Sequence, residues 1–319
     1  MLSLPDFKEK KVLYIWASKD METQLKFGNS NLRLYKDGKL SKQISLFSIV
    51  AIFIIGEFTI TSHLIRKFKE CGITVFFLNN SFKYYAGIFA EAEGNTELRA
   101  LQYRMNEEQE LEFSKILLRN KIVNQYKLLS VYKKEMKSDI KSYELAIKMA
   151  TKNDRLLGLE GLVAKEYYKL LFAKYDWYRR APTTKEDINN MLLDIGYTFL
   201  FNIVDSLLRL FGFDTYKGFY HKLYFQRKSL SCDVMEPLRV LIDKALAKAY
   251  ALNRINEKDF TARKGYYEFK DWEVGKKYTQ IFSEIILDNK EEIYKYVLSW
   301  YRYYHNQEKY RKPKFTVRL

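Results

Sequence analysis

The sequence has few of the residues and segments that mark secreted or membrane proteins. Among its 319 residues there are two cysteines, Cys71 and Cys232, which lie far apart. They supply neither a disulfide framework nor a cysteine-based zinc site, which fits a reducing cytoplasm. The longest strongly apolar stretch, residues 46–56, is too short to span a bilayer as a helix. The first residues lack the basic-then-apolar order of a signal peptide. We therefore expect a soluble, cytoplasmic protein.

Acidic residues are also scarce relative to basic ones. The chain has 55 Lys and Arg residues against 39 Asp and Glu residues, which gives a formal charge of +16. A surplus of this size favours polyanionic partners, because contacts to phosphates release counterions. A lysine-rich proteome produces the same balance, so the charge alone indicates a nucleic-acid partner without specifying fold or chemistry.

The pattern of apolar residues changes near residue 90. Residues 12–90 contain short β-rich segments with a hairpin turn at 36–39, and a helix is predicted over 61–71, ending at Gly72. The predicted strands are 12–17, 31–36, 43–55 and 73–78. Beyond the acidic stretch 91–97, apolar residues recur at helical spacing in long segments. These segments are 111–132, 143–150, 155–175, 188–211, 234–251 and 278–304, with a short extended interruption at 265–271.

These patterns predict an α+β fold. A small N-terminal β-rich domain would cover residues 1–90, a linker residues 91–105, and a larger, mainly α-helical catalytic domain residues 106–319.

Glu160 interrupts an apolar stripe. Helical spacing aligns it with Leu156, Val163, Tyr167 and Leu171. A buried carboxylate is costly unless it is paired, hydrogen bonded or bound to a metal, so Glu160 needs a partner. Glycines on both sides of it would let another backbone or a DNA strand approach. The alternatives are a helix-start carboxylate and a solvated ion pair with Lys165 or Arg155.

His221, one of three histidines, lies in a loop rich in glycine and basic residues. Asp233 and Glu236 follow it, and a helix that begins near Ser229 or Ser231 places these two acids on one face. Pro237 loosens this turn, because it cannot donate to the carbonyl of residue 233. One imidazole with carboxylates suits Mn or Mg better than a structural zinc site. A surface acidic patch at a helix N-terminus remains an alternative, especially for Asp233.

Around these residues the sequence resembles the Cas1 family of CRISPR adaptation integrases. The family's glycine-flanked glutamate motif is matched by LLGLEGLVAKEYY (156–168), its histidine motif by GFYHK (218–222) and its acid-Met-Glu-Pro helix by SLSCDVMEPLRVLID (229–243). Earlier segments, including LRNKIVNQYKLL (118–129), are also similar, so the likeness spans roughly residues 12–255.

The resemblance implies an N-terminal domain for homodimerisation and a helical domain with the active site. Its metal ligands correspond to Glu160, His221 and Glu236, with Asp233 a nearby catalytic acid whose direct ligation is left open. The expected cofactor is a divalent metal, manganese or magnesium. The expected partners are protospacer and CRISPR-repeat DNA and a small ferredoxin-like companion protein. Lys222, Arg227 and Arg239 flank the ligands and are predicted DNA-binding residues.

The reaction that the resemblance implies is spacer acquisition. A protospacer 3′-hydroxyl would attack a phosphodiester of the array, and water in its place would make the same centre an endonuclease. Two alternatives are a metal-dependent DNase or resolvase in DNA repair, and a non-catalytic DNA-binding scaffold.

Overall fold

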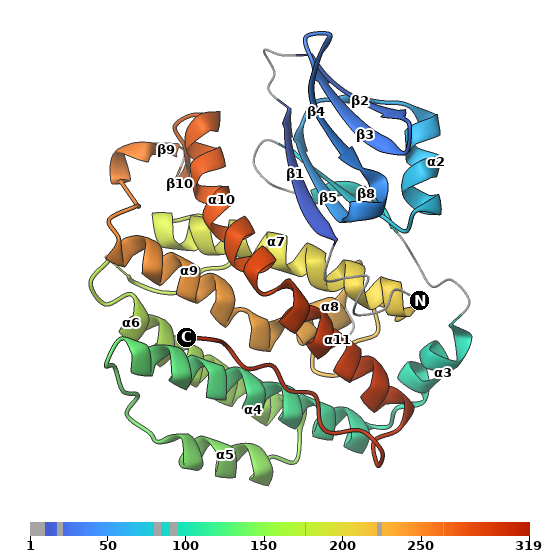
Figure 1. The fold of residues 1–319 in the computed structure, drawn as a ribbon. Coiled ribbons are helices and arrows are strands. Elements are labelled where there is room, and N and C mark those ends of the chain that lie inside the picture. The colour runs from blue at the N-terminus through green and yellow to red at the C-terminus, as the bar shows by residue number, and fades with distance from the viewer. Residues whose placement is uncertain are drawn as a thin grey trace. The chain divides into compact units, whose positions relative to one another are not determined.

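The structure, a computed structural model, describes residues 10–17, 22–79, 84–89, 95–175, 177–221, 225–263 and 265–319. The chain divides into two compact units, one of residues 1–94 with 209–212 and the other of residues 95–208 with 213–319 (Figure 1). The first is rich in strands and the second is mostly helical, as predicted for the α+β class. Within the range predicted as linker, the structure has helix α3, Thr96–Arg104.

The N-terminal unit contains two four-stranded sheets and helix α2, Ser62–Glu70. One sheet has the order β1 (Lys11–Ala17), β5 (Ile49–Gly56), β7 (Thr74–Leu78), β8 (Tyr84–Ile88), and the other β4 (Lys39–Ser45), β3 (Asn31–Lys36), β2 (Thr23–Gly28), β6 (Thr59–Ile60). Strands β1, β5 and β7 are parallel, and the middle residues of β5 are fully buried, as is typical of parallel strands.

Local signals explain several boundaries in this unit. The Thr61 side chain caps α2 by accepting from the amide of Leu64, and Gly72 ends the turn after it with φ +68°. Asp37 and Gly38 have positive φ in the predicted hairpin turn. The predicted strand 43–55 is wrong, because the 3₁₀ turn Leu46–Ser48 separates β4 from β5.

The helical unit is built around helices α4 to α11. Their bounds are α4 Glu107–Val131, α5 Ile140–Met149, α6 Asn153–Leu171, α7 Ile188–Phe211, α8 Ser229–Met235, α9 Val240–Ala251, α10 Trp272–Asp288 and α11 Lys290–His305. The 3₁₀ turn η2, Glu236–Leu238, joins α8 to α9, and η3, Glu257–Asp259, precedes a hairpin of β9 (Phe260–Arg263) and β10 (Tyr266–Phe269).

Two predicted helices are therefore wrong in extent. The range 234–251 is divided at η2, where Pro237 removes a backbone donor, and the range 278–304 is divided at Asn289.

Helix α7 is long and apolar enough to cross a membrane, yet 83% of its most apolar window is buried inside the protein. At Gly196 an added Cβ would lie 2.4 Å from the Ile242 side chain, so α7 and α9 approach closely there.

The C-terminal residues pack along α4 (Figure 1). The Asn120 side chain accepts from the Phe315 amide at 2.8 Å and donates to the Phe315 carbonyl at 2.7 Å. One turn later, the Asn124 side chain accepts from the amide of Val317 at 2.9 Å. Two asparagines of α4 thus bind the tail as a neighbouring strand would.

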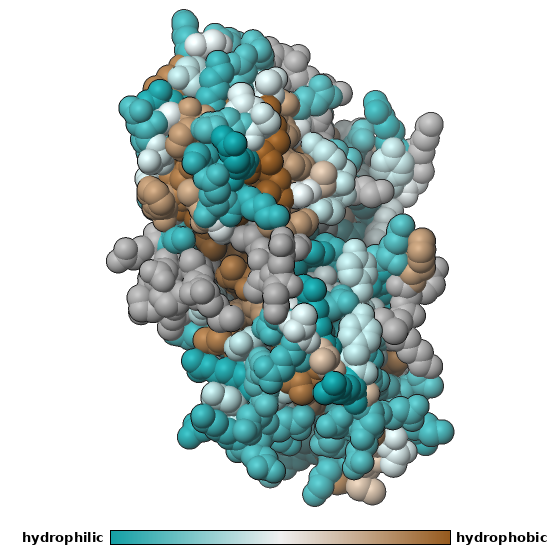
Figure 2. All heavy atoms as spheres, turned by 90° about the vertical axis from the view of Figure 1, so that its right-hand side faces the viewer, coloured by the Kyte–Doolittle hydropathy of each residue, from teal (hydrophilic) through white to brown (hydrophobic). Residues whose placement is uncertain are grey.

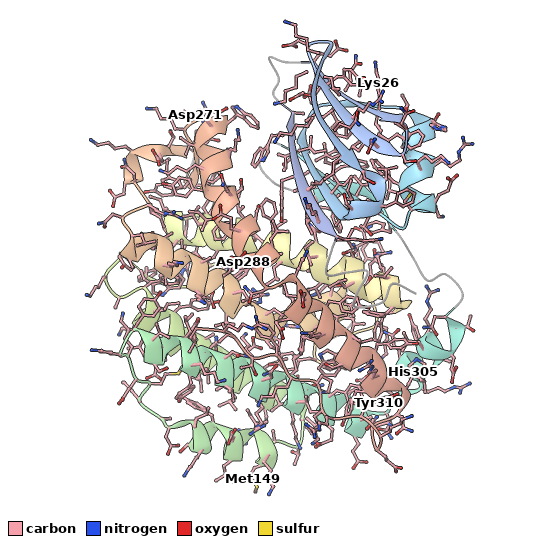
Figure 3. All side chains as sticks on the ribbon, in the orientation of Figure 1. Lys26, Met149, Asp271, Asp288, His305 and Tyr310 are labelled. Atoms are coloured by element: carbon pink, nitrogen blue, oxygen red, sulfur yellow. The ribbon has the colours of Figure 1, made fainter. Side chains whose placement is uncertain are left out.

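Charged and polar side chains dominate the face of the protein shown in Figure 2. Some large apolar residues are nevertheless exposed, among them Leu145 and Met149 of α5 and Leu162 of α6. Met149 points away from the helical unit at the end of α5 (Figure 3). Met149 and Leu162 border a groove between α5 and α6 that Gly158 also lines.

Candidate active site

Two carboxylates from different helices meet at one ammonium group. Lys121 of α4 pairs with Glu160 Oε1, and its Nζ lies 2.7 Å from Glu236 Oε2. The three side chains are 9%, 17% and 5% exposed, respectively. Glu160 lies on the apolar stripe of α6, whose other members are buried, as the sequence predicts. Its partner is Lys121 rather than a basic residue of its own helix.

Glu236 begins the 3₁₀ turn that Pro237 helps to form. Burial favours its neutral form, but Arg239 and Lys121 outweigh this effect and lower the pKa of Glu236 to about 2. Glu236 is therefore a carboxylate at neutral pH.

Asp233 holds the loop that carries His221. Its Oδ2 accepts from the amides of Phe219 and Tyr220 at 2.8 and 2.9 Å, and its Oδ1 accepts from the amide of His221 at 3.1 Å. The imidazole Nδ1 of His221 lies 2.6 Å from the same Oδ1. Both oxygens of this fully buried acid are thus occupied, which suits Asp233 to positioning rather than to direct ligation. An Nδ1–H that donates to Asp233 leaves the Nε2 lone pair of His221 for a ligand.

Tyr220 connects the loop to Glu160. Its hydroxyl donates to Glu160 Oε2 at 2.6 Å, while its amide donates to Asp233. Gly218 lets the loop pack this tightly, because an added Cβ would lie 2.6 Å from Asp233 Oδ2 and 2.9 Å from the Ser229 backbone. Beside His221 lies a pocket of about 470 Å³, lined by the starts of α4 and α6 and by residues 217–221.

The start of α8 is held by a second buried acid. Asp205 of α7 accepts from the Ser231 hydroxyl and the Lys228 ammonium, both at 2.8 Å. Helix α8 begins at Ser229, as predicted. The register that brings Asp233 and Glu236 to the site is therefore set by contacts outside the site.

The three predicted DNA-binding residues differ in surroundings. Arg239 lies with Nε 3.0 Å from Glu236 Oε2, in ion-pair rather than hydrogen-bond geometry, and its guanidinium stacks 4.7 Å from the ring centre of Tyr197. A quarter of its side chain is exposed. Arg227 is exposed, and Lys222 lies outside the described residues. Their contacts with DNA stay predictions.

The described residues contain no group of three or more His, Cys, Asp and Glu side chains placed to hold a metal ion. Glu160 and Glu236 instead converge on the Lys121 ammonium. The donor chemistry still fits an oxygen-preferring divalent ion, because two carboxylates already converge on a cation and an imidazole is oriented nearby.

Lys121 and Tyr220 are members of the site that the sequence did not predict. Lys121 is separated from Glu160 by 39 positions and from Glu236 by 115, so no local spacing connects them. One signal was present. Lys121 lies in a stretch of α4 whose neighbours Leu117, Leu118 and Ile122 are buried, and a lysine there requires an acidic partner.

Comparison with known proteins decides the family. The family model described as CRISPR associated protein Cas1 matches residues 16–284. The chain belongs to the Cas1 family. A relative named CRISPR-associated endonuclease Cas1 1, from Thermodesulfovibrio yellowstonii, is 28% identical over 310 residues, covering 86% of this chain and 97% of the relative.

Solved structures agree with this Cas1 assignment at the level of fold. A casposase bound to integration product has a TM-score of 0.81 and 22% identity, with coverage of 97% of this chain and 96% of the casposase. A chain of a Cas6-RT-Cas1–Cas2 complex has a TM-score of 0.74 and 23% identity, with coverage of 97% of this chain and 36% of that longer one.

Proposed function

We propose that this Cas1 protein is a metal-dependent DNA integrase that inserts protospacer DNA into a CRISPR array, with endonuclease activity at the same centre. The observation that carries the proposal is the convergence of Glu160 and Glu236 beside a His221 that Asp233 orients. The names of the endonuclease relative and of the casposase complex support the same reaction class.

The metal ligands in this proposal are Glu160, Glu236 and Nε2 of His221. When bound there, a manganese or magnesium ion would supply Lewis acidity toward a phosphodiester. The protein orients the ligands: Asp233 fixes His221, Tyr220 restrains Glu160, and Arg239 neutralises Glu236. In joining, the 3′-hydroxyl oxygen bonds to phosphorus as the bond from phosphorus to the leaving 3′-oxygen breaks; the hydroxyl proton passes to solvent and the leaving oxygen takes up a proton from solvent. In hydrolysis, water replaces the hydroxyl.

The proposed partners are DNA, a second copy of this chain and a Cas2-type companion protein. The charge of +16 favours DNA, and Arg227 is exposed for phosphate contact. The Cas1–Cas2 complex among the similar structures supports the companion. A cytoplasmic location is consistent with these partners.

Joining of labelled DNA tests the proposal. Linear DNA with a free 3′-hydroxyl is incubated with a supercoiled repeat-containing plasmid, the companion protein and Mn²⁺ or Mg²⁺, and covalent joining is measured. We expect joined product with either metal, and none with EDTA or a 3′-dideoxy end.

Variants separate the site from the rest of the chain. Glu160→Ala and His221→Ala should abolish joining while keeping DNA binding, and Glu166→Ala, a control acid on the same helix, should join normally. Hydrolysis without joining would favour the repair nuclease, and normal joining by Glu160→Ala would refute the ligand assignment.

A further inference from the structure

The point between the two proposed ligand carboxylates is occupied by a cation of the protein itself. The Lys121 ammonium contacts Glu160 and lies 2.7 Å from Glu236, and only 9% of the lysine side chain is exposed. A metal ion bound to both carboxylates needs the same space. Metal and ammonium therefore exclude one another from this point.

Charge balance leads to the same conclusion. Two carboxylates, Glu160 and Glu236, face two cations, Lys121 and Arg239, so this part of the site is neutral. The charge of Asp233 is taken up by the donors of residues 219–221. A divalent ion added here produces a surplus of positive charge where little water screens it. An incoming anion relieves that surplus.

The surroundings allow the Lys121 side chain to move while its helix stays in place. Asn120 and Asn124, on either side of it in α4, are bound to the C-terminal tail, and this holds the backbone of α4. Lysine has a flexible four-carbon stem and a compact charge, so its ammonium can change partners without a backbone shift.

We propose that Lys121 couples metal binding to DNA binding by yielding its position between Glu160 and Glu236 to the metal and pairing with a phosphate oxygen of bound DNA. The inference rests on the proposed function. It requires that a divalent ion bind weakly to the protein alone and more tightly when DNA supplies the phosphate. By linkage, the metal strengthens DNA binding by the same factor.

Isothermal titration with Mn²⁺ tests this coupling without relying on activity. The wild type, Lys121→Met and Lys127→Met are titrated alone and with saturating DNA whose 3′ ends are dideoxy-blocked. Lys127→Met repeats the substitution on α4 outside the site. We expect DNA to tighten Mn²⁺ binding to the wild type and to Lys127→Met by about tenfold or more. Lys121→Met should bind Mn²⁺ about tenfold more tightly than the wild type without DNA, and DNA should add less than about twofold.

Thermal melting gives a second measure and a check on folding. Because Lys121→Met removes the ammonium that pairs with both Glu160 and Glu236, its melting temperature should fall without metal and rise more with Mn²⁺ than that of the wild type. Lys121→Gln, which keeps a hydrogen-bond donor but no charge, is used in the titrations if Lys121→Met does not fold without metal.

The outcomes separate this inference from the proposed function. Equal Mn²⁺ affinity of the wild type with and without DNA, or unchanged coupling in the Lys121 variants, overturns the inference and leaves the metal site intact. If neither the wild type nor any variant binds Mn²⁺ even with DNA present, the assignment of the metal site is wrong, and the inference is wrong with it.

Discussion

Replacing Asp233 with asparagine tests how the His221 loop is held. The carboxylate receives four donors, two on each oxygen. An asparagine side chain offers one acceptor oxygen and one NH₂ group. If the NH₂ group faces the amides of Phe219 and Tyr220, two buried donors lose their acceptor; if it faces His221, the imidazole accepts in its other tautomer and only the His221 amide loses its acceptor. A buried donor left without an acceptor costs about 1–3 kcal/mol, so the expected loss in the free energy of unfolding is about 1–6 kcal/mol.

The assay is urea unfolding of the wild type, Asp233→Asn and a control, Asp288→Asn, whose side chain is exposed at the end of α10 (Figure 3). The free energy of unfolding of Asp288→Asn should stay within about 0.5 kcal/mol of the wild-type value. Asp233→Asn should also lose joining activity, because His221 is no longer oriented. If the free energy of unfolding of Asp233→Asn lies within about 1 kcal/mol of the wild-type value, Asp233 does not hold the loop in this way.

Three further predictions follow from the structure, each measured by urea unfolding. Gly218→Ala should lower the free energy of unfolding by about 1–3 kcal/mol, because the added Cβ meets Asp233 and the Ser229 backbone. Gly158→Ala, which has open space around it, should raise the free energy of unfolding by about 1 kcal/mol. Equal effects of the two substitutions would contradict this prediction. Burial outweighs the hydrogen bonds from Tyr197 and Tyr167 and raises the pKa of Asp243 from 3.8 to about 6. As pH rises, the unfolded chain therefore loses this proton at a lower pH than the folded protein does, and the free energy of unfolding should fall between about pH 4 and pH 6. Asp243→Asn should lack this component, which corresponds to about 3 kcal/mol, and parallel pH profiles for the two proteins would argue against it. Asn120→Ala removes two of the hydrogen bonds that hold the tail on α4 and should lower the free energy of unfolding by about 2 kcal/mol. It should also speed proteolysis of residues 314–319, and unchanged stability and cleavage would contradict this role of Asn120.

Much of the fold could be predicted because its signals are local. The helix that ends before Gly72 and the turn at Asp37 and Gly38 depend on capping and on positive φ, which neighbouring residues reveal. The strand predicted over 43–55 failed because an apolar run does not show the short turn Leu46–Ser48. The helix predicted over 278–304 failed because apolar periodicity continues across Asn289.

The site could be predicted only in part, for the same physical reason. Helical spacing marked Glu160 as an acid in an apolar stripe, and α8 begins at Ser229, near the predicted start, although no side chain caps it. The partners of these acids come from distant positions, so Lys121 and Tyr220 became visible only through contacts in space. The different roles of Asp233 and Glu236 also depend on the fold. Both oxygens of Asp233 accept hydrogen bonds from the loop, which suits it to positioning, whereas Glu236 faces two cations, which suits it to binding a metal.

Anomalous scattering tests most directly whether Glu160, Glu236 and His221 coordinate one divalent ion. Crystals of the protein grown with Mn²⁺ and 3′-blocked DNA are measured at the manganese edge. We expect one peak about 2.0–2.3 Å from both carboxylates and from Nε2 of His221, with the Lys121 ammonium displaced. A peak that lacks either carboxylate, or no peak with Lys121 still between Glu160 and Glu236, would contradict it.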